Sequence, residues 1–157
     1  MTVRIVEQPF DPARELAAFA RGRSDVGAVA SFTGLVRDEH GGERILAMTL
    51  EHYPGMTERQ LARIEAEARA RWPLLDALVI HRVGRMLPGE PIVLVATASA
   101  HRAAALEACA FLIDWLKTKA PFWKLEETPT GARWVEARAS DDAAAARWER
   151  REPSSPR

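Results

Sequence analysis

Apolar residues in this chain fall into short runs typical of strands, separated by longer stretches in which they recur at helical spacing. Turn-forming segments divide several of the runs. Residues 38–43 are polar and glycine-containing, and residues 87–90 and 129–131 each combine a proline with a glycine. Each segment predicts a hairpin between the strands on either side of it. The expected strands are residues 3–6, 26–37, 44–53, 75–83, 91–98, 122–127 and 133–138, with 26–37 largely buried.

Helical spacing predicts two helices in the first half of the chain. Asp11 is a suitable N-cap, and Pro12 fits the first turn of a helix that runs to about residue 21. Thr57 is the expected cap of the next helix. The apolar face of that helix contains Leu61, Ile64, Ala68 and Trp72.

A third, longer helix is expected from about residue 100 to 117, with Ser99 as its cap. A short alanine-rich helix is expected beyond Asp141, followed by a Pro/Ser tail. We therefore expect one domain, residues 1–148, and a disordered tail, residues 149–157. Strand pairs mixed with helices indicate an α+β fold, with antiparallel strands and packed helices. The inner stripe of the long helix would be Ala105, Leu106, Cys109, Leu112, Ile113 and Leu116.

Composition narrows the classes of function. The 157 residues carry 22 basic and 22 acidic side chains, so no net positive charge would attract nucleic acid or an anionic membrane. No apolar run is long enough to span a membrane. The four histidines have no metal-ligand spacing, so no metal site is expected. A single cysteine fits a reducing compartment, and a cytoplasmic enzyme or binding domain without a cofactor is the expectation.

Residues 117–124 place three lysines around a proline and two aromatic residues, directly after the long helix. Partial burial beside Phe122 and Trp123, together with mutual repulsion, would lower the pKa of an ammonium group there. Such groups suit catalysis or the binding of an anion. The alternative is a helix C-terminus whose lysines complement the helix dipole, with Pro121 ending the helix.

Three further residues are candidates for binding an anion. His101 and Arg102 fall in the first turn of the long helix, where a cation opposes the helix dipole unless an anion binds there. A surface arginine paired with a carboxylate is an equally good interpretation. Arg37, at the end of a strand, can direct its guanidinium at a phosphate, although strand-end arginines are commonly solvated.

Helix geometry separates these candidates. Residues 101 and 117 lie sixteen positions apart, or about 24 Å at ~1.5 Å per residue, so one small substrate cannot touch both within one chain. Two separate sites would explain this, and so would a two-fold dimer with a shared pocket, which is our hypothesis. Cys109 lies on the inner stripe and is expected to be buried rather than a nucleophile.

Several short segments of the sequence, taken together, resemble the family of large catalytic subunits of molybdopterin synthase. The resemblance spans about residues 3 to 148, and no single short motif carries it. The matching segments are Phe-Thr-Gly-Leu-Val-Arg at 32–37, Leu-Glu-His-Tyr-Pro-Gly-Met at 50–56, Ile-His-Arg at 80–82, Ser-Ala-His-Arg at 99–102, residues 116–124, and Trp-Val-Glu-Ala-Arg at 134–138.

The resemblance implies a hammerhead-type α+β fold and a homodimer within a heterotetramer. Each copy would bind a small ubiquitin-like sulfur-carrier subunit, whose C-terminal Gly-Gly bears a thiocarboxylate. The implied enzyme is a sulfurtransferase of molybdenum cofactor biosynthesis. It converts cyclic pyranopterin monophosphate into molybdopterin by installing two sulfurs. The alternative is a non-catalytic module that binds a phosphorylated pterin or a nucleotide.

The resemblance also implies roles for individual residues. Lys117 and Lys124 match the two essential lysines: Lys117 would act on the carbon that is thiolated, and Lys124, desolvated by Trp123, would shuttle protons. Arg138 matches an arginine that reaches the pocket of the neighbouring copy. The implied substrate-binding residues are Arg37, His101, Arg102, Lys117, Lys124 and Glu126.

Overall fold

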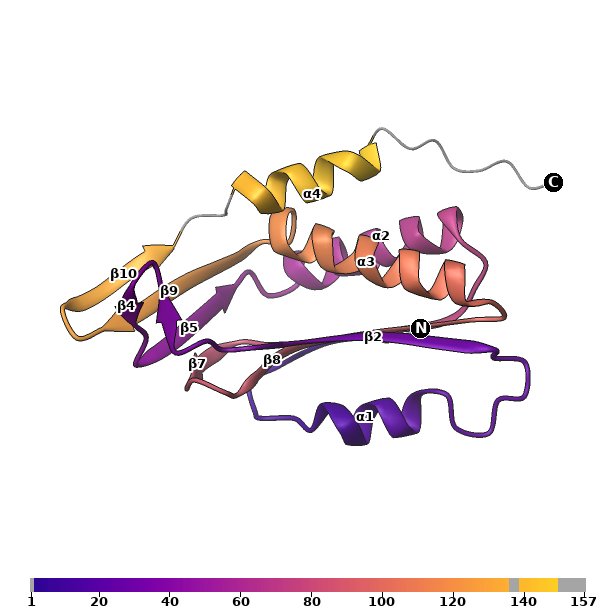
Figure 1. The fold of residues 1–157 in the computed structure, drawn as a ribbon, viewed down its shortest axis with the longest axis horizontal. Coiled ribbons are helices and arrows are strands. Elements are labelled where there is room, and N and C mark those ends of the chain that lie inside the picture. Colours follow the sequence, from indigo (N-terminus) through magenta and orange to yellow (C-terminus); the bar gives the residue numbers. More distant parts are fainter. Residues whose placement is uncertain (1, 136–138, 150–157) are drawn as a thin grey trace.

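A computed structural model describes residues 2–135 and 139–149 (Figure 1). Its first sheet has four strands in the order β1-β6-β8-β2. Within it β1 runs parallel to β6, and the other neighbours are antiparallel. The strands are β1 (Thr2–Val6), β6 (Leu74–Arg82), β8 (Pro91–Ser99) and β2 (Ala28–Leu35).

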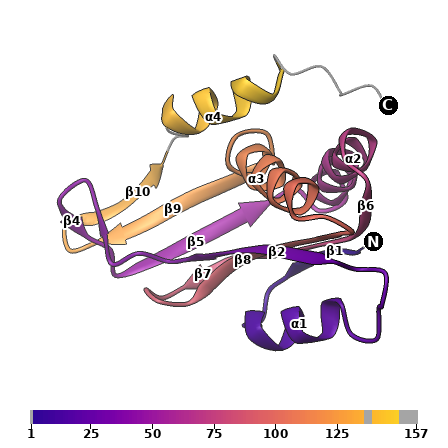
Figure 2. The same ribbon diagram turned by 45° about the vertical axis from the view of Figure 1, so that its right-hand side comes forward.

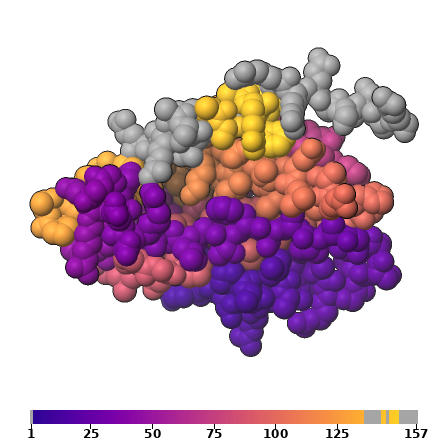
Figure 3. All heavy atoms as spheres, in the orientation of Figure 1, coloured from indigo at the N-terminus to yellow at the C-terminus, as the bar shows by residue number. Residues whose placement is uncertain are grey.

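Helices cover both faces of this sheet (Figure 2). Helix α1 (Pro12–Phe19) packs on one face, where Leu16 and Phe19 meet a small apolar cluster around Ile80 and Leu94. Helices α2 (Met56–Arg71) and α3 (Arg102–Thr118) cover the other face and form the main core with it. Helix α4 (Ala139–Glu149) lies on α3, as the yellow and orange surfaces in Figure 3 show.

A second sheet projects from one end of the first, in the order β10-β9-β5-β7. Its strands are β10 (Gly131–Val135), β9 (Phe122–Thr128), β5 (Ala47–His52) and β7 (Gly84–Met86). A small hairpin joins β3 (Glu39–His40) to β4 (Glu43–Arg44) through Gly41 and Gly42, both at positive φ. No helix in the described ranges is long and apolar enough to cross a membrane.

Two of the three predicted hairpins are confirmed. Strand β6 pairs with β8, with β7 inserted between them in the chain, and β9 pairs with β10 around the turn at Thr128 and Gly131. The predicted pairing of residues 26–37 with 44–53 is wrong. Strand β2 pairs with β8, and β5 pairs with β7 and β9. The polar segment 38–43 instead contributes to a separate hairpin between the two-residue strands β3 and β4. As a result, β2 and β5 belong to different sheets.

The prediction that residues 26–37 are largely buried is also wrong. Strand β2 is an edge of the first sheet, and Ala30 is its one buried residue. Val29, Phe32 and Leu35 are 42%, 38% and 52% exposed. An apolar run without alternation predicts burial on both faces. Here the run leaves an apolar, hydrogen-bonding edge open at the surface.

The predicted cap of α1 is confirmed, because the Asp11 carboxylate accepts a hydrogen bond from the Ala13 amide at 3.0 Å. Helix α2 is capped two residues earlier than predicted, at Gly55, whose amide donates to the Glu58 carboxylate. Thr57 is buried instead, and its hydroxyl donates to the carbonyl of Pro121 at 3.4 Å. This bond ties the start of α2 to the segment between α3 and β9.

Ser99 does not cap α3. It is buried and donates to the carbonyl of Pro73 at 2.9 Å, and His101 is the N-cap. The chain also approaches closely at Gly27, whose amide donates to the Ser99 carbonyl. A Cβ at position 27 would lie 2.1 Å from the Ala100 carbonyl oxygen, so only glycine fits there.

The predicted inner stripe of α3 is mostly confirmed. Four of its members are buried, Ile113 is half-buried, and Leu106 is 60% exposed, so its assignment is wrong. Phe111 is fully buried and was missed. It contacts Trp72, the C-cap of α2, and Trp148 of α4. The predicted alanine-rich helix is confirmed as α4, and Trp148 joins it to the core. The buried members of the stripe are Ala105, Cys109, Leu112 and Leu116. Residues 150–157 of the predicted tail lie outside the described residues.

Candidate active site

A cavity of about 570 Å³ opens where the second sheet meets the end of α3. Four of the predicted site residues line it. Arg37 comes from the segment after β2, Lys117 from the last turn of α3, and Lys124 and Glu126 from β9. Strand β5 supplies an apolar wall, because Leu50 is paired opposite Lys124 in the sheet and Met48 opposite Glu126. The fold therefore brings three cations and a carboxylate to one hollow.

The two lysines reach the cavity from opposite sides of a tight connection. Helix α3 is capped by Lys119, whose amide donates to the Trp115 carbonyl at 2.7 Å, and β9 starts at Phe122. Lys124 is half-buried, as the sequence predicts. Lys117 is exposed in the single chain, so the expected desolvation of this lysine is wrong for the isolated subunit.

Phe122, not Trp123, is the aromatic residue that shares the cavity with Lys124. Side chains alternate along a strand, so Phe122 and Lys124 face the cavity, and Trp123 faces the opposite side of the sheet. Trp123 packs edge-on against Tyr53, with ring centroids 4.6 Å apart, and both rings are exposed. The prediction that Trp123 desolvates Lys124 is wrong, because sequence adjacency in a strand separates the two side chains.

Glu126 is buried and held by a neighbouring hairpin. Its carboxylate lies 2.5 Å from Nδ1 of His40 on β3, and Nε of Arg133 lies 3.9 Å away. Arg133 also donates to the His40 carbonyl at 3.3 Å and pairs with Glu43 at 2.6 Å. These bonds fasten the β3–β4 hairpin against the second sheet, beside the cavity.

His81 also lines the cavity, although the sequence analysis gave it no role. It is 7% exposed on β6, and its ring stacks on Phe122 with centroids 4.0 Å apart. Burial lowers the pKa of His81 to about 4, and the nearby charge of Lys117 acts in the same direction. Two features of the sequence could have pointed to His81. It is a histidine within an apolar strand, and it lies in the Ile-His-Arg segment at 80–82 that contributes to the family resemblance.

The lowered pKa of His81 predicts a specific acid sensitivity. The ordinary pKa is 6.5 and the folded-state pKa is about 4, so the unfolded chain binds the proton first. The stabilising contribution is complete above pH 6.5 and is lost as the pH falls toward 4. Between pH 7 and pH 4 the wild type should lose roughly 3 kcal/mol more unfolding free energy than His81→Gln, measured by urea unfolding. Equal losses would contradict the neutral state of the ring.

His101 and Arg102 lie at the other end of α3 and are exposed. Neither lines the cavity in the described part of the chain. The expected separation of about 24 Å from Lys117 follows from the continuous helix between them. One chain therefore does not join the two groups of predicted residues. Arg138 lies outside the described residues.

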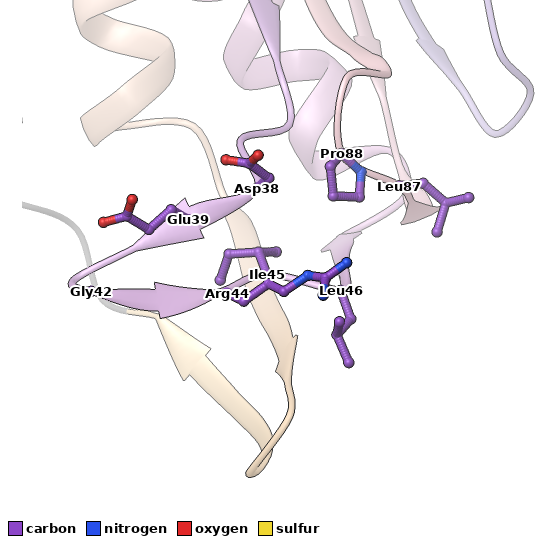
Figure 4. Close-up of a pocket in the computed structure, with 8 residues that line it drawn as sticks. All are labelled: Asp38, Glu39, Gly42, Arg44, Ile45, Leu46, Leu87 and Pro88. Carbon is purple, nitrogen blue, oxygen red and sulfur yellow. The ribbon is translucent and has the colours of Figure 1, made fainter.

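A second hollow of about 650 Å³ lies between the β3–β4 hairpin and the turn at Leu87 and Pro88. Figure 4 shows the carboxylates of Asp38 and Glu39 and the guanidinium of Arg44 there, with Leu87 and Pro88 opposite. It contains none of the predicted site residues. The cavity with the two lysines is the better candidate for an active site.

Cys109 is buried in α3, as predicted, with its sulfur 4.0 Å from the Val95 carbonyl oxygen. Burial raises the pKa of this thiol to about 11, so it remains protonated near neutral pH. It does not line the cavity. Among the described residues, no group of three or more His, Cys, Asp or Glu side chains is arranged to hold a metal ion.

Comparisons with known proteins agree with the resemblance. The family described as "MoaE protein" matches residues 5–119. The molybdopterin synthase catalytic subunit of Pseudomonas aeruginosa is 56% identical over 95% of this chain and 99% of its own length. A MoaE structure from Burkholderia ambifaria superposes with a TM-score of 0.80 at 53% identity, covering 94% of this chain and 97% of that one.

A more distant structure shows the same fold. The molybdopterin synthase chain from Staphylococcus aureus superposes with a TM-score of 0.78 at 31% identity, covering 85% of this chain and 96% of that one. The expected α+β fold is confirmed, with packed helices and strands that are antiparallel except for the β1–β6 pair. The family match covers more than half of the sequence, and the relatives align over nearly all of it. The chain therefore belongs to the MoaE protein family.

Proposed function

We propose that this chain is the catalytic subunit of a molybdopterin synthase, a sulfurtransferase that converts cyclic pyranopterin monophosphate into molybdopterin. The observation that carries the proposal is the cavity in which Lys117 and Lys124 converge with Arg37. Its apolar walls suit a pterin ring, and its cations suit a phosphate. The curated relatives are named catalytic subunits, which favours an enzyme over a non-catalytic binding module.

The sulfur has to come from another molecule. Cys109 is the one cysteine in the sequence, and its buried thiol lies away from the cavity. A small ubiquitin-like carrier, ending in a Gly-Gly thiocarboxylate, supplies the sulfur by extending its tail to the two lysines. The Pseudomonas aeruginosa relative is named a catalytic subunit, which is consistent with an enzyme that contains a second kind of chain.

Replacing Cys109 by serine tests whether the transferred sulfur comes from the carrier and not from this thiol. The variant should keep its turnover within about twofold of wild type, because the thiol touches neither substrate nor carrier. Its stability should fall by about 1–3 kcal/mol, since a more polar hydroxyl replaces a buried thiol. Rates measured below the melting temperature separate the two effects. A folded but inactive variant would contradict a carrier source of sulfur.

Each cavity residue takes a role from its charge and position. Arg37 binds the phosphate with its guanidinium. Lys117 acts on the carbon that is thiolated, either by polarising its oxygen or through a transient imine, and borohydride trapping of an adduct distinguishes these routes. Lys124 transfers protons as the cyclic phosphate opens and the carrier thioester is hydrolysed. Glu126, fixed by His40, contacts the substrate.

The active form is a homodimer, and with two carriers it is a heterotetramer in the cytoplasm. His101 and Arg102 lie too far from Lys117 to serve the same pocket in one chain. A second copy can bring them, together with Arg138, to the cavity of the first. The open apolar edge of β2 leaves surface available for such a contact.

Reconstitution tests the proposed reaction. The purified chain, mixed with thiocarboxylated carrier and cyclic pyranopterin monophosphate, should form molybdopterin, detected by its fluorescent oxidation product. Carrier with an ordinary carboxylate terminus is the matched control and should give none. Absence of product with a folded chain and an intact thiocarboxylate would refute the proposal.

A further inference from the structure

His81 is held more rigidly than a surface histidine. Its backbone belongs to β6, where it is paired with Ile5 of β1 on one side and Val93 of β8 on the other. Its ring lies against Phe122, with an interplanar angle of 17°. Phe122 begins β9, the strand that also carries Lys124. Both sheets therefore fix the orientation of this imidazole in the cavity wall.

The hydrogen bond of the ring defines its tautomer. Nδ1 lies 3.0 Å from the carbonyl oxygen of Arg82, and a carbonyl oxygen only accepts, so Nδ1 carries the proton. Burial and the charge of Lys117 keep the ring neutral at physiological pH. In this tautomer Nε2 carries a lone pair and acts as an acceptor. The cavity wall thus contains a fixed neutral acceptor among several cations.

We propose that His81 is a positioning residue for Lys117: in the enzyme–substrate complex Nε2 accepts a hydrogen bond from the Lys117 ammonium and directs that group at the reacting carbon. The inference rests on the proposed function, because Lys117 needs a defined position only if it acts on the substrate. A long lysine side chain at an exposed helix end has many rotamers, and an acceptor bond to a charged donor restricts them.

Two amide variants separate this role from a structural one. In His81→Gln the side-chain amide reaches the position of Nε2, so an acceptor stays available to Lys117. In His81→Asn the amide lies near the position of Nδ1, so the bond to the Arg82 carbonyl is kept and the acceptor is lost. We expect His81→Gln to stay within about fivefold of wild-type kcat, and His81→Asn to lose about ten- to a hundredfold.

The pH profile adds a readout that packing alone does not move. An acceptor stabilises the ammonium form, so the limb of the kcat/KM profile that reports Lys117 should move to lower pH in His81→Asn and stay in place in His81→Gln. Equal activities of the two variants, whether high or low, would overturn the proposal.

A measurement without substrate keeps this test independent of the proposed reaction. The pKa of His81, followed by NMR in the wild-type chain, should rise by at least about half a pH unit in Lys117→Met, because a nearby cation is removed. Lys119→Met, at the same helix end, is the control and should leave it unchanged. An unchanged His81 pKa in Lys117→Met would show that the Lys117 ammonium does not lie near the ring, and would refute the proposal even if the enzyme is active. Failure of the reconstituted reaction with a shifted pKa would refute only the proposed function.

Discussion

Replacing Lys117 by alanine is expected to lower the rate of molybdopterin formation by about a thousandfold, with little change in stability. The side chain lines the cavity from the last turn of α3 and is exposed there, outside the buried core. Its loss removes the cation that we propose acts on the reacting carbon, and removing one such group commonly costs two to four orders of magnitude in kcat. Single-turnover kinetics with preloaded substrate and thiocarboxylated carrier measure the effect.

Lys119→Ala is the matched control, two residues further along the same helix end. Lys119 lies over the Trp115 ring at 5.4 Å and pairs with Glu149 at 3.7 Å. It does not line the cavity. Loss of an exposed pair changes stability by no more than about 1 kcal/mol, so turnover should stay near wild type. Similar losses in both variants would show that the helix end matters for folding or docking, and would contradict a chemical role of Lys117. A Lys117→Ala variant that binds substrate normally but forms no product excludes the simple binding module.

The elements with strong local signals were predicted well. Asp11 caps α1 because its carboxylate reaches the Ala13 amide two residues away, and the Pro129–Gly131 turn joins β9 to β10 as expected. Strand pairing was predicted less well, because it depends on contacts far apart in sequence. Strand β2 pairs with β8 rather than with the next strand along the chain. Its apolar run has the same pattern as a buried strand, so the sequence alone does not distinguish a core from an open edge.

The candidate site was predicted in part for a similar reason. Lys117, Lys124 and Arg37 stood out as cations in unusual local settings, and the cavity brings them together. His81 lacked such a setting, because its neighbours in the cavity wall come from β9 and α3. Trp123 was misassigned because adjacency along a strand means opposite faces. Contacts between elements decide these roles, and within the described part of one chain His101 does not line the cavity.

Mixing two inactive variants is expected to restore activity if the pocket is shared between copies. Lys117→Ala and His101→Ala place their defects at opposite ends of α3. In a dimer where each pocket uses Lys117 of one chain and His101 of the other, a mixed dimer contains one doubly defective pocket and one intact pocket. Random exchange of equal amounts makes half of the dimers mixed. About one quarter of all pockets are then intact, and the mixture should show about that share of wild-type turnover.

The control mixture combines Lys117→Ala with Lys124→Ala. Both residues line the same cavity in one chain, so every pocket of a mixed dimer keeps one defect and no activity should return. Exchange in both mixtures is checked by native mass spectrometry with one chain isotopically labelled. Recovery in the first mixture alone places His101 in the pocket of the neighbouring copy. Recovery in neither, despite mixed dimers, or a fully active His101→Ala homodimer, would refute sharing and leave the N-terminus of α3 outside the reaction.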